Sequence, residues 1–273
     1  MEATIKANIS KDINNRFAVH VVSNPEFLRE GSAVKDFEHP DKIVVGINKA
    51  ADSKYPIELM RNLYGAIKLR NDLYIEVSNE TAELCKYACN AFLAMKVSYI
   101  NEIAQLCNVV GANVQDVAKS MGADGRISGK FLNPGPGYGG SCFPKDVKAL
   151  EHIAKEHSQD LALISSLSTS NKDHIKRSAR KIIDTFGDVG GKQIAVLGLS
   201  FKPKTDDVRD SPAISIIKTL LEYGANVRAT CPKGIPEMKK QIEGNKYHIR
   251  YFDDVYETVM VGDAIFFVTY GKL

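Results

Sequence analysis

The sequence predicts an α/β protein in three parts, and three observations support this prediction. Short apolar runs alternate with a helical pattern over residues 1–77, as in part of an α/β unit. Apolar residues at helical spacing dominate residues 78–189. Strand and helix patterns alternate again over residues 190–273, which is typical of a parallel sheet. We therefore expect two α/β regions separated by an all-helical region.

The first part contains three strand patterns, and turn residues separate them. A β-branched run at residues 17–22 is followed by Ser-Asn-Pro, which is a turn signal. The remaining elements expected here are a strand at residues 43–47, a helix at 55–66 and a strand at 72–77. These residues are too few for a complete doubly wound sheet.

One very long helix pattern follows. Ser78 can cap a helix that continues to about residue 110, and Gly111 ends it. Glu80 and Glu83 lie in the first turn, where the helix dipole favours acidic side chains. Apolar residues recur at helical spacing at Leu84, Ala88, Ala91, Met95 and Tyr99. A helix of about 45 Å exceeds what a small domain needs, so we expect an interface between subunits.

The remaining elements follow in order. Further helices are expected at residues 114–121, 146–157 and 161–186. Gly190 and Gly191 mark a boundary before a buried-strand pattern. The elements after this boundary are strands at 193–198, 225–230 and 264–269, a helix at 211–223 with Pro212 in its first turn, and a weak helix at 236–243.

The composition excludes several classes of protein. A length of 273 residues allows two domains with cores of their own, and a net charge of +3 is too small to indicate nucleic-acid binding. The five cysteines form no CxxC and no Cys/His ligand pattern, so we expect a reducing compartment and no metal site. Residues 1–16 lack an apolar core, and no apolar run approaches the roughly 20 residues that span a bilayer. We therefore expect a cytoplasmic protein that does not bind a membrane.

Residues 133–146 carry the strongest chemical signal. They read Asn-Pro-Gly-Pro-Gly-Tyr-Gly-Gly-Ser-Cys-Phe-Pro-Lys-Asp. A thiolate at Cys142 is a nucleophile, a cation such as Lys145 lowers a thiol pKa, and a carboxylate such as Asp146 can position a water. This combination suggests covalent catalysis. A structural turn around a buried cysteine explains the same residues equally well.

Two further pairs of residues suggest binding or catalysis. Glu26 and Glu30 would share one face of a helical turn, where two like charges raise one pKa as a general base requires. Lys86 and Asn90 have the same spacing and could stabilise an oxyanion. Taken alone, each pair fits an ordinary solvated surface better.

The segment at residues 201–212 follows a strand and precedes a helix, the usual place for a ligand in an open α/β sheet. Lys202 and Arg209 could hold phosphate there. No Gly-x-Gly-x-x-Gly follows a strand anywhere in the chain, so the sequence carries no dinucleotide fingerprint.

Four segments occur together in a recognisable order. They read Ser-Asn-Pro-Glu-Phe-Leu-Arg-Glu-Gly at 23–31, Thr-Ala-Glu-Leu-Cys-Lys at 81–86 with Asn-Ala-Phe-Leu-Ala at 90–94, Gly-Gly-Ser-Cys-Phe-Pro-Lys-Asp at 139–146, and Leu-Gly-Leu-Ser-Phe-Lys at 197–202 with Thr-Asp-Asp-x-Arg-x-Ser-Pro at 205–212. In these segments the chain resembles the UDP-glucose/GDP-mannose dehydrogenase family, and the resemblance covers nearly all of it.

The resemblance implies a reaction and a role for each catalytic candidate. The family oxidises the C6 alcohol of a nucleotide sugar to a carboxylate with two NAD+ per turnover. Cys142 would be the nucleophile, forming a thiohemiacetal and then a thioester. Lys86 and Asn90 would stabilise oxyanions at C6, Asp146 would manage a water and a proton, and Glu26 would act as base in thioester hydrolysis.

The resemblance also implies binding residues. The substrate-binding residues would be Glu26, Lys86, Asn90, Arg126, Lys130, Phe131, Asn133, Gly137, Tyr138, Gly139, Phe201 and Lys202. Arg126 would reach the substrate of the neighbouring subunit. Glu30, Lys145 and Arg209 would serve the NAD cofactor. The segments look most like the UDP-glucose branch, and the GDP-mannose and UDP-N-acetylhexosamine branches remain alternatives.

The resemblance further implies a domain organisation. Residues 1–77 would be the remainder of an N-terminal Rossmann-like NAD-binding lobe. Residues 78–189 would be a helical domain that carries the catalytic cysteine and forms a homodimer through the long helix. Residues 190–273 would be an incomplete Rossmann-like UDP-binding domain.

The chain departs from the family pattern at both ends. The first nucleotide-binding lobe and its glycine fingerprint are missing, and Ala-Thr-Ile-Lys at 3–6 is at best a remnant of the Ser-Thr-Val-Pro element. Thr-Cys-Pro at 230–232 replaces the usual Tyr-Asp-Pro, and the sequence ends near Thr-Tyr-Gly at 269–271. We expect a shortened enzyme of low activity whose NAD-binding lobe is supplied separately, or a non-catalytic sugar-nucleotide-binding or scaffold protein.

Overall fold

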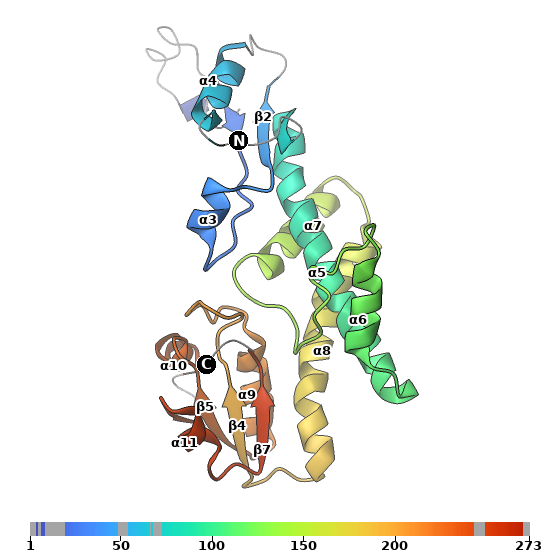
Figure 1. Cartoon of the computed structure of the whole chain (residues 1–273), viewed down its shortest axis with the longest axis vertical. Coiled ribbons are helices and arrows are strands. Elements are labelled where there is room, and N and C mark those ends of the chain that lie inside the picture. Colours follow the sequence, from blue (N-terminus) through green and yellow to red (C-terminus); the bar gives the residue numbers. More distant parts are fainter. Residues whose placement is uncertain are drawn as a thin grey trace. The chain divides into compact units, whose positions relative to one another are not determined.

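The computed structural model describes residues 4, 7, 8, 20–48, 54–65, 67, 73–242 and 249–269. The chain divides into two compact units, Met1–Ala88 and Cys89–Leu273, and the division falls inside helix α5 (Asn79–Val110). Each unit contains one sheet (Figure 1). The protein is thus an α/β protein, as its sequence predicts.

The first unit is built on a three-stranded sheet in the order β1-β2-β3. Strand β1 pairs antiparallel with β2, and β2 pairs parallel with β3. The elements before α5 are β1 (Val22–Ser23), α3 (Ala33–Glu38), β2 (Ile43–Ile47), α4 (Lys54–Tyr64) and β3 (Tyr74–Val77). The apolar residues of β2 pack against Ile57, Met60 and Tyr64 of α4. Strand β2, helix α4 and strand β3 therefore form one parallel βαβ unit.

The sequence analysis located β2, α4 and β3 but erred at the start of this unit. Residues 17–19 of the strand expected at 17–22 lie outside the described residues, and of the rest only Val22 is in a strand. Helix α3 was not expected, because its six residues have no apolar periodicity. Ser78 caps α5 as predicted, since its Oγ accepts a hydrogen bond from Thr81 N at 3.3 Å.

An ion pair joins the loop before α3 to that helix. Asp36 Oδ2 accepts hydrogen bonds from Arg29 N at 2.8 Å, Arg29 Nε at 3.0 Å and Ser32 Oγ at 3.1 Å. The guanidinium of Arg29 also reaches Oδ1 at 2.5 Å. These bonds, above all those from the guanidinium, hold the pKa of Asp36 well below its usual range.

The second unit begins with helices and ends with a parallel sheet. Its helices before the sheet are the remainder of α5, α6 (Val114–Ala123), α7 (Phe143–Glu156) and α8 (Ala162–Phe186). The elements that follow are β4 (Gln193–Leu197), α9 (Pro212–Glu222), β5 (Asn226–Thr230), α10 (Ile235–Ile242), β6 (Ile249–Tyr251), α11 (Val255–Val259) and β7 (Ala264–Phe267). All pairings in this sheet are parallel, in the order β6-β5-β4-β7, which confirms the predicted parallel sheet.

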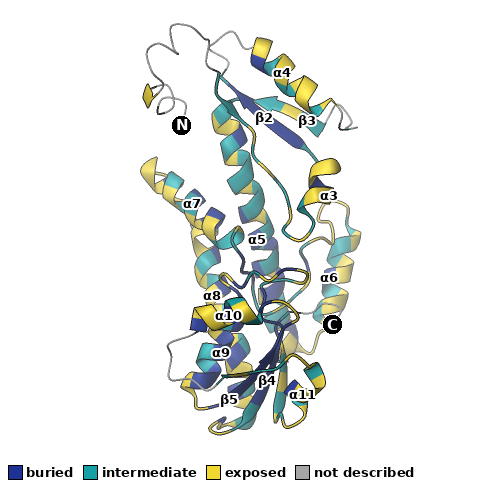
Figure 2. Cartoon of the chain, turned by 90° about the vertical axis from the view of Figure 1, so that its left-hand side faces the viewer, coloured by how far each residue is buried: buried dark blue, intermediate teal, exposed yellow. Residues whose placement is uncertain are grey.

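Helices α8 and α9 cover one face of this sheet. Ile194 and Val196 of β4 belong to the same buried cluster as Ile216 of α9 and Ile183 of α8. Strands β4 and β5 are mostly buried (Figure 2). Strands β5 and β6 lie on one side of β4, and β7 lies on the other, so the strand order reverses between β4 and β7. Open α/β sheets bind ligands at such a topological switch point.

Three details of this unit differ from expectation. Helix α7 begins at Phe143, three residues before the predicted start, because Pro144 fits the first turn of a helix rather than a loop. Strand β6 and helix α11 were not expected. Both are too short to show a periodic pattern, at three and five residues.

Two negative findings concern only the residues that the structure describes. None of their helices is long and apolar enough to cross a membrane. Within the same ranges, no group of three or more His, Cys, Asp or Glu side chains could hold a metal ion.

The pairing of Asp36 predicts a pH-dependent stability. A carboxylate whose folded pKa is lowered stabilises the fold above its unfolded pKa of about 3.9, and this contribution is lost as the pH falls toward the folded pKa. We expect Asp36→Asn to be less stable than the native chain at pH 7, with a difference that narrows below about pH 4. Urea unfolding followed by circular dichroism at pH 7 and pH 3.5 measures it.

Glu38→Gln on the exposed side of α3 is the matched control and should change stability little at either pH. An Asp36→Asn difference that is constant with pH would contradict the assigned cause.

Candidate active site

Cys142 lies at the N-terminal end of α7 and is exposed to solvent. The two glycines before its neighbour Ser141 fix how the loop runs. A Cβ at Gly139 would lie 2.1 Å from Asp210 O, and one at Gly140 would lie 2.6 Å from the Phe201 ring. Gly140 N also donates to Arg209 O at 2.8 Å. The loop can therefore contact the segment between β4 and α9 only because both positions lack a side chain.

Asp146 stands one helical turn after Cys142 and is completely buried. Its Oδ2 accepts a hydrogen bond from Asn90 Nδ2 at 2.5 Å, and its Oδ1 pairs with the ammonium of Lys145. A buried carboxylate requires such partners, because an unpaired charge is costly away from water. The structure thus brings Asn90 of α5 and Asp146 of α7 together, and both lie in the set predicted from the sequence.

Lys86 and Glu26 form a second contact, within the first unit. Lys86 Nζ donates to Glu26 Oε1 and to the backbone O of Glu26, each at 2.6 Å. The other carboxylate oxygen of Glu26 accepts from Leu28 N at 2.7 Å. The Lys86 ammonium also lies 5.8 Å from the centre of the Phe27 ring. The carboxylate expected to act as a base is therefore held by a cation.

Glu26 and Glu30 do not lie on a helical turn, which agrees with the solvated surface that their spacing alone favoured. Residues 24–29 have no regular secondary structure. Asn24 donates to Val44 O at 2.8 Å, and Glu26 turns to Lys86 and Leu28. Because this segment is not helical, the carboxylates of Glu26 and Glu30 do not share a helical face.

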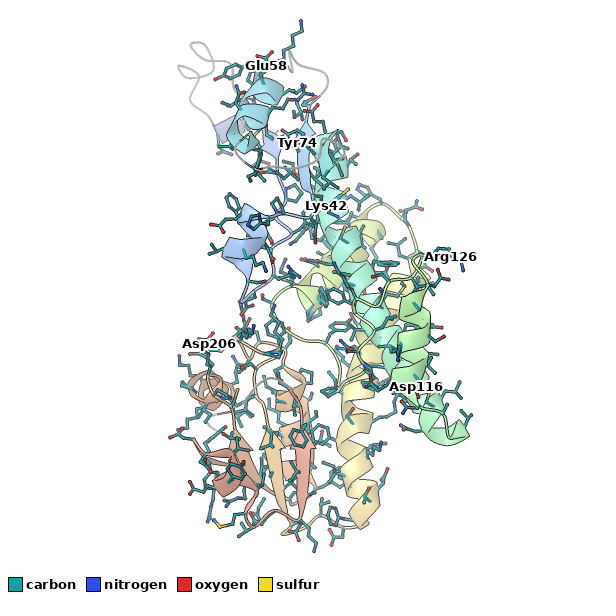
Figure 3. All side chains as sticks on the ribbon, in the orientation of Figure 1. Lys42, Glu58, Tyr74, Asp116, Arg126 and Asp206 are labelled. Carbon is teal, nitrogen blue, oxygen red and sulfur yellow. The ribbon has the colours of Figure 1, made fainter. Side chains whose placement is uncertain are left out.

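The turn after α6 carries several residues expected to bind substrate. Arg126 projects into solvent (Figure 3), with 89% of its side chain exposed, and its guanidinium pairs with Asp124 at 2.5 Å. This pairing holds the pKa of Asp124 below its usual value. Lys130 is exposed, and Asn133 lines a surface pocket together with Gln115 of α6.

An aromatic cluster joins this turn to the cysteine loop. The Phe143 ring lies 6.1 Å from the Phe131 ring and 6.0 Å from the Tyr138 ring, measured between centres. Tyr138 is buried, and burial raises its pKa to about 12. Two of the expected substrate residues, Phe131 and Tyr138, are thus packed against the neighbour of Cys142.

The expected phosphate contacts lie between β4 and α9. The guanidinium of Arg209 pairs with Asp207 at 2.8 Å, and the Lys202 ammonium lies 5.2 Å from the centre of the Phe201 ring. Ser211 caps α9 through Ala213 N. Arg209 therefore has a carboxylate partner that the sequence analysis did not assign.

The sequence analysis also missed Lys96. This α5 residue is only 8% exposed, and its ammonium donates to Ile127 O at 3.0 Å and Ser128 O at 2.9 Å. It therefore holds the turn that carries Arg126 and Lys130. A lysine within a helical pattern gives no sign of burial, so no sequence signal identified it.

Comparison with protein families matches three domain models of the UDP-glucose/GDP-mannose dehydrogenase family along the chain. The NAD binding domain matches residues 1–68, the central domain residues 80–173 and the UDP binding domain residues 195–272. The matches cover most of the chain, and the NAD binding, central and UDP binding domains follow one another along it.

Curated relatives and solved structures agree with these matches. A UDP-glucose 6-dehydrogenase of Rhizobium meliloti strain 1021 is 47% identical over 262 residues, which cover 96% of this chain and 59% of that protein. UDP-glucose 6-dehydrogenase TuaD of Bacillus subtilis strain 168 is 41% identical over 265 residues, covering 97% of this chain and 55% of that protein. The chain spans somewhat more than half the length of these relatives.

A UDP-glucose dehydrogenase structure from Pyrobaculum islandicum superposes with a TM-score of 0.85 at 32% identity, over 92% of this chain and 56% of that one. A UDP-D-ManNAc dehydrogenase structure from Pyrococcus horikoshii gives 0.75 at 26% identity, over 92% and 55%. Sequence, structure and domain order lead to one conclusion: the chain belongs to the UDP-glucose/GDP-mannose dehydrogenase family.

Proposed function

We propose that this chain is part of a nucleotide-sugar dehydrogenase of the UDP-glucose 6-dehydrogenase type, which converts UDP-glucose to UDP-glucuronate. The observation that carries the proposal is the cluster at the start of α7. There an exposed thiol, Cys142, stands one turn from the buried Asp146, which Asn90 and Lys145 hold. These groups can supply a nucleophile, a water-orienting carboxylate and an oxyanion donor for the covalent oxidation of an aldehyde.

Each group has a role in this proposal. The Cys142 thiolate attacks the C6 aldehyde of the sugar and forms a thiohemiacetal, whose oxidation gives a thioester. Asn90 and Lys86 donate hydrogen bonds to the oxygen that carries negative charge at C6. Asp146 orients a water, and Glu26 accepts the proton of that water as it cleaves the thioester and releases the thiol.

Substrate binding is assigned to the loops around this cluster. The cations Lys130 and Lys202 suit a diphosphate, because ammonium groups form charge-assisted hydrogen bonds with phosphate. Arg126 is proposed to reach the substrate of a partner subunit. The remaining proposed substrate contacts are Phe131, Asn133, Gly137, Tyr138, Gly139 and Phe201.

NAD+, when bound, would accept a hydride from C6 in each of the two oxidations. The unit of β2, α4 and β3 has the βαβ architecture that dinucleotides use, and the sequence at residues 48–53 contains no glycine. We propose that a separate NAD-binding lobe supplies this site and that Glu30, Lys145 and Arg209 complete it.

We further propose that residues 1–77, 78–189 and 190–273 act as parts of an NAD-binding, a helical dimerisation and a UDP-binding domain. Helix α5 supports a homodimer, because Phe92, Tyr99 and Leu106 are seven residues apart and 57%, 49% and 57% exposed. A seven-residue apolar repeat is the pattern by which helices pair.

One observation favours a second candidate function. The missing glycine fingerprint would leave a sugar-nucleotide-binding or scaffold protein that keeps the cysteine site without hydride transfer. GDP-mannose and UDP-N-acetylhexosamine are alternative substrates, since a UDP-D-ManNAc dehydrogenase is among the similar structures.

The chain alone is expected to form little or no NADH from UDP-glucose and NAD+, because it lacks a pyrophosphate-binding turn. Absorbance at the NADH band, with Cys142→Ala as control, tests this. Sustained formation of about two NADH per sugar, absent in the control, would overturn the need for a separate lobe and establish the enzyme.

UDP-glucose is expected to slow the alkylation of Cys142 by iodoacetamide, because a bound sugar covers the exposed thiol. In Lys130→Ala the UDP-glucose concentration for half protection should rise about tenfold, the effect of one charge-assisted hydrogen bond. Peptide mass spectrometry gives the alkylation rate at Cys142 alone. Lys176→Ala, an exposed residue of α8, is the matched control. Equal protection in both variants would remove Lys130 from the substrate site.

Phe92→Glu and Leu106→Glu are expected to convert a dimer to a monomer, since each places a charge in the apolar stripe of α5. Sedimentation velocity measures the change. Leu163→Glu alters another exposed apolar residue, on α8, and should leave the dimer intact. A native chain that sediments as a monomer at micromolar concentration would contradict the proposed interface.

A further inference from the structure

The main chain just before the cysteine loop is held by side chains rather than by secondary structure. Tyr138 N donates to Asn171 Oδ1, and Tyr138 O accepts from Asn171 Nδ2, both at 2.9 Å. Asn171 lies on α8 and is only 8% exposed. Its amide thus pairs with both polar groups of one residue, as a neighbouring strand would.

A second pair of contacts holds Gly135. Gly135 N donates to Asn101 Oδ1 at 2.9 Å, and Gly135 O lies 2.7 Å from His174 Nε2. The other ring nitrogen of His174 lies 2.9 Å from Gln105 Nε2. A carbonyl oxygen only accepts, so Nε2 of His174 must carry a proton. Burial lowers the pKa of His174 and favours the neutral form, in which Nδ1 accepts from Gln105.

The residue between these two contacts lets the loop approach α8 closely. Gly137 has a φ of +125°, and a Cβ there would lie 2.6 Å from Ile175 Cγ1 and 2.9 Å from Asn171 Oδ1. Only glycine allows this approach. Residues 135–138 are therefore fixed against α5 and α8, while Gly140 is fixed against Arg209 O.

We propose that Asn171 and His174 are positioning residues for Cys142. They fix the backbone of residues 135–138, and through it the glycine turn that leads to the thiol. This inference rests on the proposed function, because it takes Cys142 as the nucleophile. A nucleophile must be held within about 0.5 Å of its productive place, so a loop without regular structure needs supports of this kind.

The test compares substitutions at two α8 residues that bond to the loop with a substitution at an α8 residue that bonds to another helix. Asn171→Ala removes both bonds to Tyr138. His174→Leu removes the donor to Gly135 O, and His174→Gln restores an N–H donor of similar reach. Ser170→Ala is the matched control, since Ser170 Oγ donates to Glu102 Oε1 of α5 at 2.6 Å, a contact between two helices rather than with the loop.

Hydrogen exchange of the 133–142 segment, measured by mass spectrometry, is the first readout. We expect about tenfold faster exchange in Asn171→Ala and His174→Leu, with α7 and α8 unchanged and with His174→Gln and Ser170→Ala like the native chain. Unchanged exchange in the segment would overturn the proposal. Faster exchange throughout the helices would also overturn it, because the residues would then be general supports of the fold.

Protection of Cys142 from iodoacetamide by UDP-glucose is the second readout. In Asn171→Ala the UDP-glucose concentration for half protection should rise about tenfold, and His174→Gln should retain the native value. If the 133–142 segment exchanges faster in Asn171→Ala but the UDP-glucose concentration for half protection is unchanged, Asn171 does not position the site and the proposal is overturned. If UDP-glucose does not protect the native chain, the proposed function fails, whereas the exchange measurement still decides whether these residues fix the loop.

Discussion

The site depends on the backbone contact between the glycine turn at 139–140 and the segment that joins β4 to α9. Gly139 lies so close to Asp210 O that a side chain would overlap it, and Gly140 lies against the Phe201 ring. This contact links the start of α7 to the C-terminal sheet. Because Cys142 and Asp146 follow directly on α7, their places depend on it. The absence of side chains at these two glycines is thus what allows Cys142 and Asp146 to take their places.

The second constraint is the burial of Asp146. A carboxylate with no exposed surface is stable only if ammonium and amide partners surround it, and Lys145 and Asn90 provide them. Asn90 belongs to α5, so the need to pair Asp146 ties two helices together at the thiol. Removing either partner would leave a buried charge, whereas an exposed pair such as Arg126 and Asp124 costs little to break. The catalytic candidates are therefore also structural.

Sequence patterns located the long helices and the parallel sheet because periodic apolar residues extend over many turns. They failed at short elements, since α3 and β6 have too few residues for a period to show. Motif positions made Cys142, Asn90 and Asp146 candidates, but spacing alone could not reveal that Lys86 bonds Glu26, which lies 60 residues away. Nor could it reveal the burial of Lys96. Such contacts arise only when distant segments meet in the fold.

These constraints suggest how the work is divided along the chain. The cluster around Cys142 is fixed by contacts inside the second unit, among α5, α7, α8 and the loop after β4, whereas Glu26 and Lys86 pair inside the first unit. None of these contacts needs a dinucleotide. It follows that the thiol and its buried carboxylate are held in place by contacts within the protein alone.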